Sequence, residues 1–333
     1  MDPVSQGILG ASLAGSLSKS KKLKLASLCG FFGGLTPDLD ILIKSSTDPL
    51  LSLEFHRHFT HSIFFVPLGA LITGLFLFLF LRKSLSFKEI YFYSAAGFLT
   101  HGFLDSCTSY GTQLLWPVLD KRFSWNIISI IDPIYTFTLL IFILISIFMR
   151  SLLYVRLGVF FSCVYLVLGV YQHQNIKEFI KKVAIERGHK IERILLNPTI
   201  GNNILWRTVY QTSTTYYIDA VYSPIIGQIR FKKGTEVSFI DKETVFSDLP
   251  QDSLLRNDIR RFAYFSQNYI FLHPDYNNVI GDLRYGTLPY DYKALWGIQF
   301  DLKKPESHAN FINLRNFDND DYSEFWKMLK GKF

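Results

Sequence analysis

Cysteine is scarce in this sequence: its 333 residues include only three, Cys29, Cys107 and Cys163, and no two of them form a CxxC pair. All three lie in or beside apolar runs, and none follows residue 163. The second half of the chain therefore does not depend on disulfides for its fold. No internal repeat and no low-complexity stretch is found either, which excludes a solenoid or a repeated transporter half.

Charged side chains are also sparse, at 19% of the residues, while hydrophobic residues make up 49% and phenylalanine alone occurs 31 times. This composition is too apolar for an average soluble domain and indicates a chain that is part membrane protein and part globular. The net charge is +7 with a pI near 9.1. The early basic residues lie in short clusters between apolar runs, a pattern that orients membrane proteins, so we expect no nucleic-acid partner.

Apolar runs occupy the first half of the chain. The longest cover residues 62–81, 127–149 and 152–171, and shorter or small-residue-rich runs cover 90–104, 23–43 and 4–17. Because a bilayer needs about 20 apolar residues per helix, we expect an α-helical integral membrane domain at 1–173 with about six spanning or re-entrant helices.

The remaining residues, 174–333, predict a small α+β domain. Residues 172–193 are polar and basic and are expected to form a helix that leaves the membrane. Expected strands cover 205–210, 214–222, 225–231, 269–272, 278–283 and 295–300, and expected helices cover 253–265 and 322–329.

The basic residues also predict an orientation. Taken as six crossings, the chain places Lys19, Lys21, Lys22, Lys24, Arg82, Lys83, Lys88, Arg150 and Arg156 in or beside the odd loops, and fewer in the even loops. The odd loops are therefore expected to be cytoplasmic and both termini extracytoplasmic. The candidate site residues described next then all fall on the outer side.

His101 and Asp105 form the sharpest polar pair within an apolar run. Their i, i+4 spacing puts both on one face of a helix. Ionisable groups inside a membrane are costly, so the pair indicates a bound metal ion. The alternative is a hydrogen-bonded pair between helices.

Asp38 and Asp40 follow Pro37 in a segment where glycine and proline break the helix. Irregular backbone at membrane depth is tolerated where it lines a cavity, so these two carboxylates can converge on a cation. The alternative is a helix cap followed by a turn.

Three histidines follow in the segment 56–62. A loop that enters a helix at Thr60 could bring His56 and His61 together, whereas His58 is better explained as an interfacial histidine. Imidazole mixed with carboxylates favours zinc, manganese or iron.

Three further residues are expected to act beside the metal. Asp132, before Pro133, could orient a ligand histidine or simply cap a helix. Arg57 and Arg122 could bind an anionic substrate through their planar donor groups, or anchor the protein at the membrane surface.

Several motifs in the right order resemble the YdjM family of bacterial inner-membrane, membrane-bound metal-dependent hydrolases. They are Met1-Asp2-Pro3-Val4-Ser5-Gln6-Gly7, Pro37-Asp38-Leu39-Asp40, His56-Arg57-His58-Phe59-Thr60-His61-Ser62, His101-Gly102-Phe103-Leu104-Asp105, Thr108-Ser109-Tyr110-Gly111-Thr112, Trp116-Pro117 and Asp132-Pro133. The resemblance covers about the first half of the chain. It implies a metal-dependent hydrolase whose ligands are Asp38, Asp40, His56, His61, His101 and Asp105. The His-x-x-x-Asp element is also similar to one in zinc phospholipase C and P1 nuclease.

The leading hypothesis is therefore a hydrolase at the outer face of the inner membrane, with a catalytic role for Arg57, Arg122 and Asp132. It would hold two or three divalent ions, zinc by preference, and act on a phospholipid or another lipid-linked, anionic phosphate ester. Alternatives are a metal transporter or metal-binding membrane protein without hydrolytic activity, and a structural envelope protein.

Overall fold

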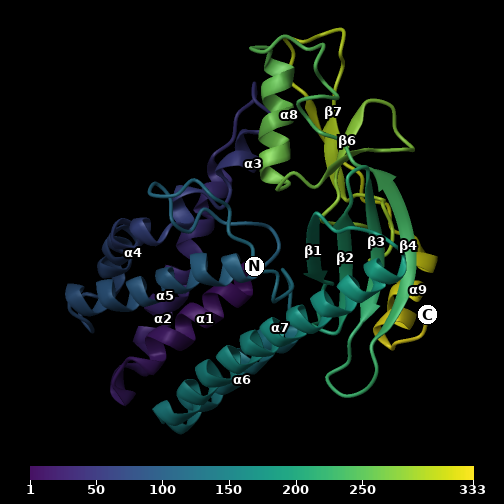
Figure 1. Ribbon diagram of the computed structural model, residues 1–333. Coiled ribbons are helices and arrows are strands. Elements are labelled where there is room, and N and C mark those ends of the chain that lie inside the picture. Colours follow the sequence, from purple (N-terminus) through teal and green to yellow (C-terminus); the bar gives the residue numbers. More distant parts are fainter. The chain divides into compact units, whose positions relative to one another are not determined.

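The helix signals of the first half become six helices of more than ten residues. They are α1 (Pro3–Ser16), α2 (Leu23–Leu35), α4 (Val66–Leu81), α5 (Phe87–Cys107), α6 (Pro133–Met149) and α7 (Leu152–Glu186). Short helices lie between them, namely η1 (Ser20–Lys22), η2 (Thr36–Leu42), α3 (Leu51–Phe55), η3 (Phe59–His61) and η4 (Ile63–Phe65). Figure 1 traces them in order from the N-terminus.

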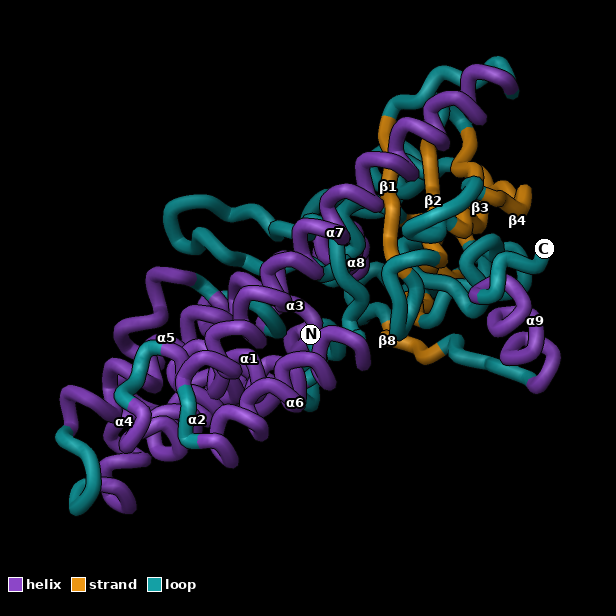
Figure 2. The backbone as a smooth tube through the Cα atoms, turned by 90° about the horizontal axis from the view of Figure 1, so that it is seen from below, coloured by secondary structure: helices purple, strands orange, loops and turns teal.

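This computed structural model describes residues 1–333, which form two compact units. The helical unit contains Met1–Ile43, Phe55–Val170 and Ile200–Asn202; the sheet unit contains Lys44–Glu54, Tyr171–Thr199 and Asn203–Phe333. The named strands all lie between Arg193 and Asn313, in the second half of the chain, and are drawn in orange in Figure 2. The short segment Lys44–Glu54 thus belongs to the sheet unit although it lies early in the sequence.

Three helical segments are long and apolar enough to cross a membrane. They are Ser20–Leu42, Ile63–Leu81 and Leu152–Glu186, while Pro133–Met149 is apolar but shorter. The prediction of an N-terminal helical region with membrane-spanning segments is confirmed at this level, and the full number of about six crossings stays a prediction.

Glycine contacts hold α1, α2 and α5 against one another. A Cβ atom on Gly30 of α2 would lie 2.3 Å from the carbonyl oxygen of Gly10 in α1, and one on Gly97 of α5 would lie 2.0 Å from the carbonyl oxygen of Gly30. Only glycine permits backbones to approach this closely, as in other membrane helix pairs. The end of α2 is thereby held beside α5, which matters for the site described below.

Two predicted helices have different limits in the structure. The helix expected at 127–149 begins at Pro133, because the Asp132 side chain accepts a hydrogen bond from the Tyr135 N–H and caps the first turn. The run expected at 152–171 continues without a break as α7 to Glu186, and the chain turns at Gly188, where φ is +73°.

The sheet unit contains two four-stranded antiparallel sheets. The first has the order β1 (Arg193–Pro198), β2 (Leu205–Gln211), β3 (Thr215–Tyr222) and β4 (Arg230–Ser238). The second has the order β5 (Ile270–Leu272), β6 (Val279–Asp282), β7 (Trp296–Gln299) and β8 (Asn310–Asn313). Helices α8 (Leu254–Phe265) and α9 (Asn319–Leu329) complete the unit.

The C-terminal half of α7 supplies the core on one face of the first sheet. Ile176, Ile180 and Ala184 are buried at helical spacing against Trp206 and Tyr210, among others. The expected α+β character of this region is confirmed as a domain with two antiparallel sheets. The strand expected at 225–231 is wrong over most of its length, because a loop with Pro224 and Gly227 precedes β4.

Candidate metal centre

The segment Thr36–Leu42 continues α2 as the 3₁₀ helix η2 and carries the two aspartates. The tighter winding follows Pro37, which has no N–H to donate to an α-helical bond. The Asp40 side chain is fully buried, whereas that of Asp38 is 19% exposed. Asp38 is therefore the more open of the two carboxylates.

Asp40 organises the turn that carries the histidines. Its Oδ1 lies 2.9 Å from His56 Nδ1, and its Oδ2 accepts hydrogen bonds from the Arg57 N–H at 2.9 Å and from Thr60 Oγ1 at 3.1 Å. Arg57 has a left-handed backbone, with φ of +61°, which is uncommon outside glycine. These hydrogen bonds hold that conformation and turn the chain so that His56 and His61 flank Asp40.

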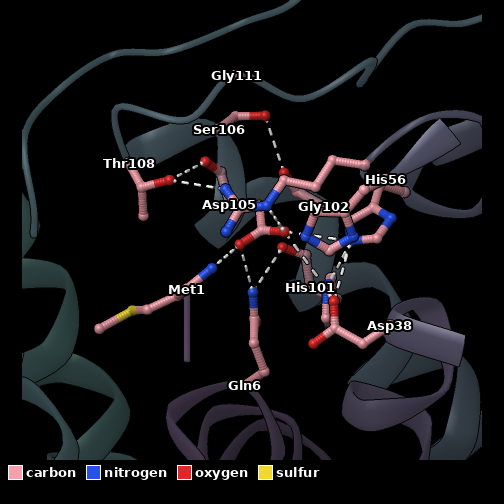
Figure 3. A network of polar contacts seen from close by, with 12 residues as sticks. Met1, Gln6, Asp38, His56, His101, Gly102, Asp105, Ser106, Thr108 and Gly111 are labelled. Atoms are coloured by element: carbon pink, nitrogen blue, oxygen red, sulfur yellow. Dashed lines mark hydrogen bonds and ion pairs between the residues drawn. The ribbon is translucent and has the colours of Figure 1, made fainter. Parts of the chain in front are cut away.

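Helix α5 presents His101 and Asp105 from one face, as their spacing predicts, and both are completely buried. The His101 ring is fixed by a 2.6 Å hydrogen bond between Nδ1 and the carbonyl oxygen of Gly34. Because a carbonyl can only accept, Nδ1 carries a proton, and Nε2 is the nitrogen that faces the other candidate ligands. Figure 3 shows these side chains converging with Asp38.

Four ligand atoms lie at nearly equal separations. His61 Nε2 and His101 Nε2 are each 3.4 Å from Asp38 Oδ1, and they lie 3.2 and 3.4 Å respectively from Asp105 Oδ2. The two nitrogens are 2.9 Å apart. Four ligands bound tetrahedrally at about 2.0–2.1 Å would be separated by about 3.3–3.4 Å. The four atoms thus fit the corners around one zinc-sized ion.

The surroundings of the second imidazole also suit a bound metal ion. His61 Nδ1 is 3.0 Å from Thr60 Oγ1 and 3.3 Å from Asp40 Oδ2, so this nitrogen has polar partners behind the ring. Both Nε2 atoms face each other and two carboxylates. A carboxylate or carbonyl behind each imidazole is the usual support for a metal-bound histidine.

Asp105 supplies the clearest sign of an additional partner. Its Oδ1 accepts one hydrogen bond from Gln6 Nε2, at 2.9 Å, and another from the Met1 amino group. Its Oδ2 is buried and has no hydrogen bond, although Arg57 Nε lies 3.2 Å away. A buried charged oxygen without a hydrogen bond is costly. This oxygen is the one that faces the two Nε2 atoms, so the residues present fit a bound divalent metal.

A second group of potential ligands adjoins the first. Asp38, Asp40 and His56 also lie close enough to hold an ion, and Asp38 is common to both groups. The structure therefore brings together all six residues that were expected as ligands, Asp38, Asp40, His56, His61, His101 and Asp105. Oxygen and nitrogen donors in this mixture suit zinc, manganese or iron.

The three residues expected beside the metal have protein partners of their own. The buried Arg57 guanidinium lies next to Asp105 and donates from Nη1 to Thr108 Oγ1 at 2.9 Å. Arg122 donates to the carbonyl oxygens of Gly111 and His56. Asp132 caps α6 and accepts a 2.7 Å hydrogen bond from Tyr165, with no contact to the ligand cluster. These contacts favour positioning roles, and substrate contact by any of the three stays a prediction.

Two supporting groups escaped sequence reasoning. The Gly34 carbonyl has no side-chain signature, so nothing in the sequence points to it. The role of Gln6 had one available signal, because it is the single amide side chain in the small and apolar helix α1.

Comparison with known proteins identifies the family of the chain. The family model described as "YdjM inner membrane protein" matches residues 1–176, which contain every candidate ligand. The chain is also similar to "Uncharacterized protein YfhP" from Bacillus subtilis (strain 168), with 29% identity over 192 residues, which is 56% of this chain and 55% of that protein. The chain thus matches about half the length of this relative. No solved structure matches the chain. From the family match, which covers more than half of its residues, the chain belongs to the YdjM inner membrane protein family.

Proposed function

We propose that this protein is a membrane-embedded, metal-dependent hydrolase that cleaves a lipid or a lipid-linked phosphate ester at the outer face of the inner membrane. The proposal is carried by the buried Asp105 Oδ2, which has no hydrogen bond and faces Nε2 of His61 and His101. A divalent ion held by these three residues and Asp38 would lower the pKa of a bound water and neutralise charge on a phosphoryl oxygen.

Proton transfer is assigned to the pair of His56 and Asp40. The His56 Nδ1 lies 2.9 Å from Asp40 Oδ1, and its side chain is 27% exposed, unlike the fully buried rings of His61 and His101. Asp40 fixes the ring and holds the proton on Nδ1, which leaves Nε2 to accept a proton from water. A histidine oriented by a carboxylate can act as a general base.

Arg57 supplies positive charge next to the ligands. Its guanidinium, 3.2 Å from Asp105 through Nε, partly balances three carboxylates that lie close together. We assign to it the task of holding Asp105 with Oδ2 toward the two histidines. Arg122 fixes the His56 turn through the His56 carbonyl oxygen, at 3.2 Å.

A lipid substrate is favoured by the apolar side chains that flank the ligands. Three exposed apolar residues lie beside the two aspartates, namely Leu39, Ile41 and Leu42. Two more, Ile63 and Phe64, lie just after His61. Exposed apolar residues on segments that adjoin candidate spans are expected to face acyl chains. A substrate that lies in the bilayer could thus reach Asp38 without leaving it.

The test is metal content and hydrolysis measured on the same preparations. Purified protein should contain a stoichiometric transition metal and release product from a bacterial lipid extract, and a chelator should stop the reaction. Asp105→Asn should lose both metal and activity. Metal that remains at full occupancy in this variant would overturn the site assignment, whereas metal without any lipid hydrolysis in the wild type would favour a metal-binding or transport protein.

His56→Asn separates the role of base from that of ligand. If His56 acts as a base, its replacement should abolish turnover and leave the metal-to-protein ratio unchanged. If the ratio falls by one ion, His56 is instead a ligand in the second group with Asp38 and Asp40.

A further inference from the structure

The loop between β3 and β4 presents isoleucines that nothing in the sheet unit covers. It comprises residues 223–229 and contains no charged side chain. Ile226 is 91% exposed and Ile225 is 64% exposed. Gly227, with φ of +124°, allows the tight bend that places both at the tip. Figure 1 shows this loop extending past the end of the first sheet.

Hydrogen bonds fix the base of the loop to one point on α7. Gln172 Nε2 donates to the carbonyl oxygen of Ser223 at 2.7 Å, and Ser223 Oγ donates back to Gln172 Oε1 at 3.3 Å. Both residues are buried. Gln172 directly follows the apolar run of α7 at residues 152–171, which spans about 30 Å and matches the hydrocarbon thickness of a bilayer. The loop base therefore lies at the level where α7 leaves the membrane.

The direction of β3 shows on which side of that level the tip lies. Earlier in the strand, Asp219 pairs with Arg187, near the far end of α7, at 2.7 Å. Four residues later, Ser223 contacts Gln172. Within the sheet unit, β3 thus runs from the Arg187 end of α7 to Gln172, the residue that follows the apolar run. The isoleucines come directly after the end of β3 that contacts Gln172.

Basic residues surround the base of the loop. Arg230 is exposed at the start of β4 and donates from Nη1 to the carbonyl oxygen of Gly331 at 2.7 Å. The exposed Lys330 and Lys332 flank that glycine. Apolar side chains at a tip with cations behind them match the layering of a bilayer, in which anionic head groups cover the acyl chains.

We propose that the 223–229 loop inserts Ile225 and Ile226 into the interfacial layer of the bilayer that α7 spans. The loop, together with α7, attaches the sheet unit to the membrane surface at two points. This inference is independent of the hydrolase proposal, because it uses no residue of the metal centre.

The test uses the full chain in nanodiscs of phosphatidylcholine and phosphatidylglycerol. Ile226→Cys, in a background with Cys163→Ala, is labelled with an environment-sensitive fluorophore. The matched control is Ile185→Cys, an exposed isoleucine on α7 about 20 Å beyond Gln172. We expect a blue-shifted emission at 226 that is quenched by lipids with brominated acyl chains, and neither effect at 185.

Equal emission at the two positions, without quenching at 226, would overturn the proposal and point to a protein partner for the loop. Ile225→Cys provides a second position if the label at 226 disturbs the loop, and it should show the same blue shift and quenching.

Discussion

Gly102 lies where α5 passes closest to the turn that carries His61. A Cβ atom at this position would be 2.1 Å from the His61 carbonyl oxygen, so the backbone on one side must move. We expect Gly102→Ala to displace the His61 ring and weaken metal binding by about 10- to 100-fold, the range seen when groups that orient ligands are altered. Competition with a chromophoric zinc chelator measures the change.

Gly74→Ala in α4 is the matched control. Its Cβ would meet nothing closer than 3.5 Å, so it should leave metal binding unchanged, and alanine favours the helix by about 1 kcal/mol. Unaltered affinity in Gly102→Ala would show that His61 is not held by this contact.

From the sequence, residues that could bind a metal were easier to identify than the role of each residue. The six candidate ligands could be named because aspartate and histidine are costly in apolar segments unless they bind something. Asp132 and Arg122 share that cost but offset it with a helix cap and with backbone carbonyls. Such partners lie far away in sequence or belong to the main chain, and residue type alone does not reveal them.

Among the elements, the segment Lys44–Glu54 joins the two parts of the metal centre, because it runs from η2 to the His56 turn. It belongs to the sheet unit, where Arg261 of α8 binds Asp48 at 2.8 Å and Glu54 at 2.7 Å. The same guanidinium pairs with Asp258. Partial burial would raise the pKa of Asp48, but the hydrogen bonds from Arg261 and the Leu50 N–H, together with the charge of Arg261, outweigh burial and hold this pKa below its usual range. Asp48, Asp258 and His308 could hold a cation, and Arg261 supplies the positive charge there.

Replacing Arg261 with alanine should release this segment. Hydrogen bonds to charged groups contribute about 1.5–3 kcal/mol, so we expect amide exchange in residues 44–54 to quicken by about tenfold or more. Metal affinity should fall as well, because the freed segment connects η2, which carries Asp38, to the turn that carries His61. Arg260→Ala is the control: Arg260 pairs with Glu243 and makes no contact with residues 44–54. Equal exchange in both variants would contradict the tether.

The turn between β5 and β6 contains His273, whose protonation should affect the stability of the sheet unit at mildly acidic pH. Burial lowers the pKa of His273, and the negative charges of Asp275 and Asp291 oppose this only in part. Because the unfolded pKa is about 6.5, the unfolded chain binds more protons as the pH falls below that value. The contribution of His273 to the stability of the sheet unit should therefore be fully present above about pH 6.5. It should be lost as the pH falls toward the lower pKa that His273 has in the folded protein.

His273→Asn retains an acceptor for the Asp275 N–H, which His273 Nδ1 holds at 3.2 Å, and removes the titration. Thermal unfolding followed between about pH 7.5 and pH 5.5 should show a smaller loss in midpoint for this variant than for the wild type. An identical loss would assign the pH dependence to other groups.

Most elements were predictable from local patterns. The strands β2 and β3 and helix α8 were expected within a few residues of their limits, because β-branched or amphipathic patterns mark them, and the short strands β5, β6 and β7 fall within expected strands. The strand β1 was missed because residues 172–193 were interpreted as one polar and basic helix, although Gly188 breaks it. The strand β8 begins and ends with asparagine, so it has little strand pattern, and it forms by pairing with β7.

The whole helical unit has a basic end and a site end. Lys22, at the start of α2, contacts Glu89 at the start of α5, and Arg156, near the start of α7, donates to the Ser16 carbonyl oxygen at the end of α1. The candidate metal ligands lie at the opposite ends of α2 and α5. The asymmetry of charge that the loop sequences predict is therefore present in three dimensions.

The difference in charge between the two ends of the helical unit predicts how the protein is oriented in the membrane. Positive loops stay in the cytoplasm, so the basic end should be cytoplasmic, and the end of α7 that leads into the sheet unit should be outside. In a background with Cys163→Ala, a cysteine at the exposed Ser247 should react with a membrane-impermeant maleimide in cells whose outer membrane is permeable. A cysteine at the exposed Ser84, between α4 and α5, should react only after lysis. The reverse pattern would place the metal centre on the cytoplasmic side, where the substrate would be an inner-leaflet lipid.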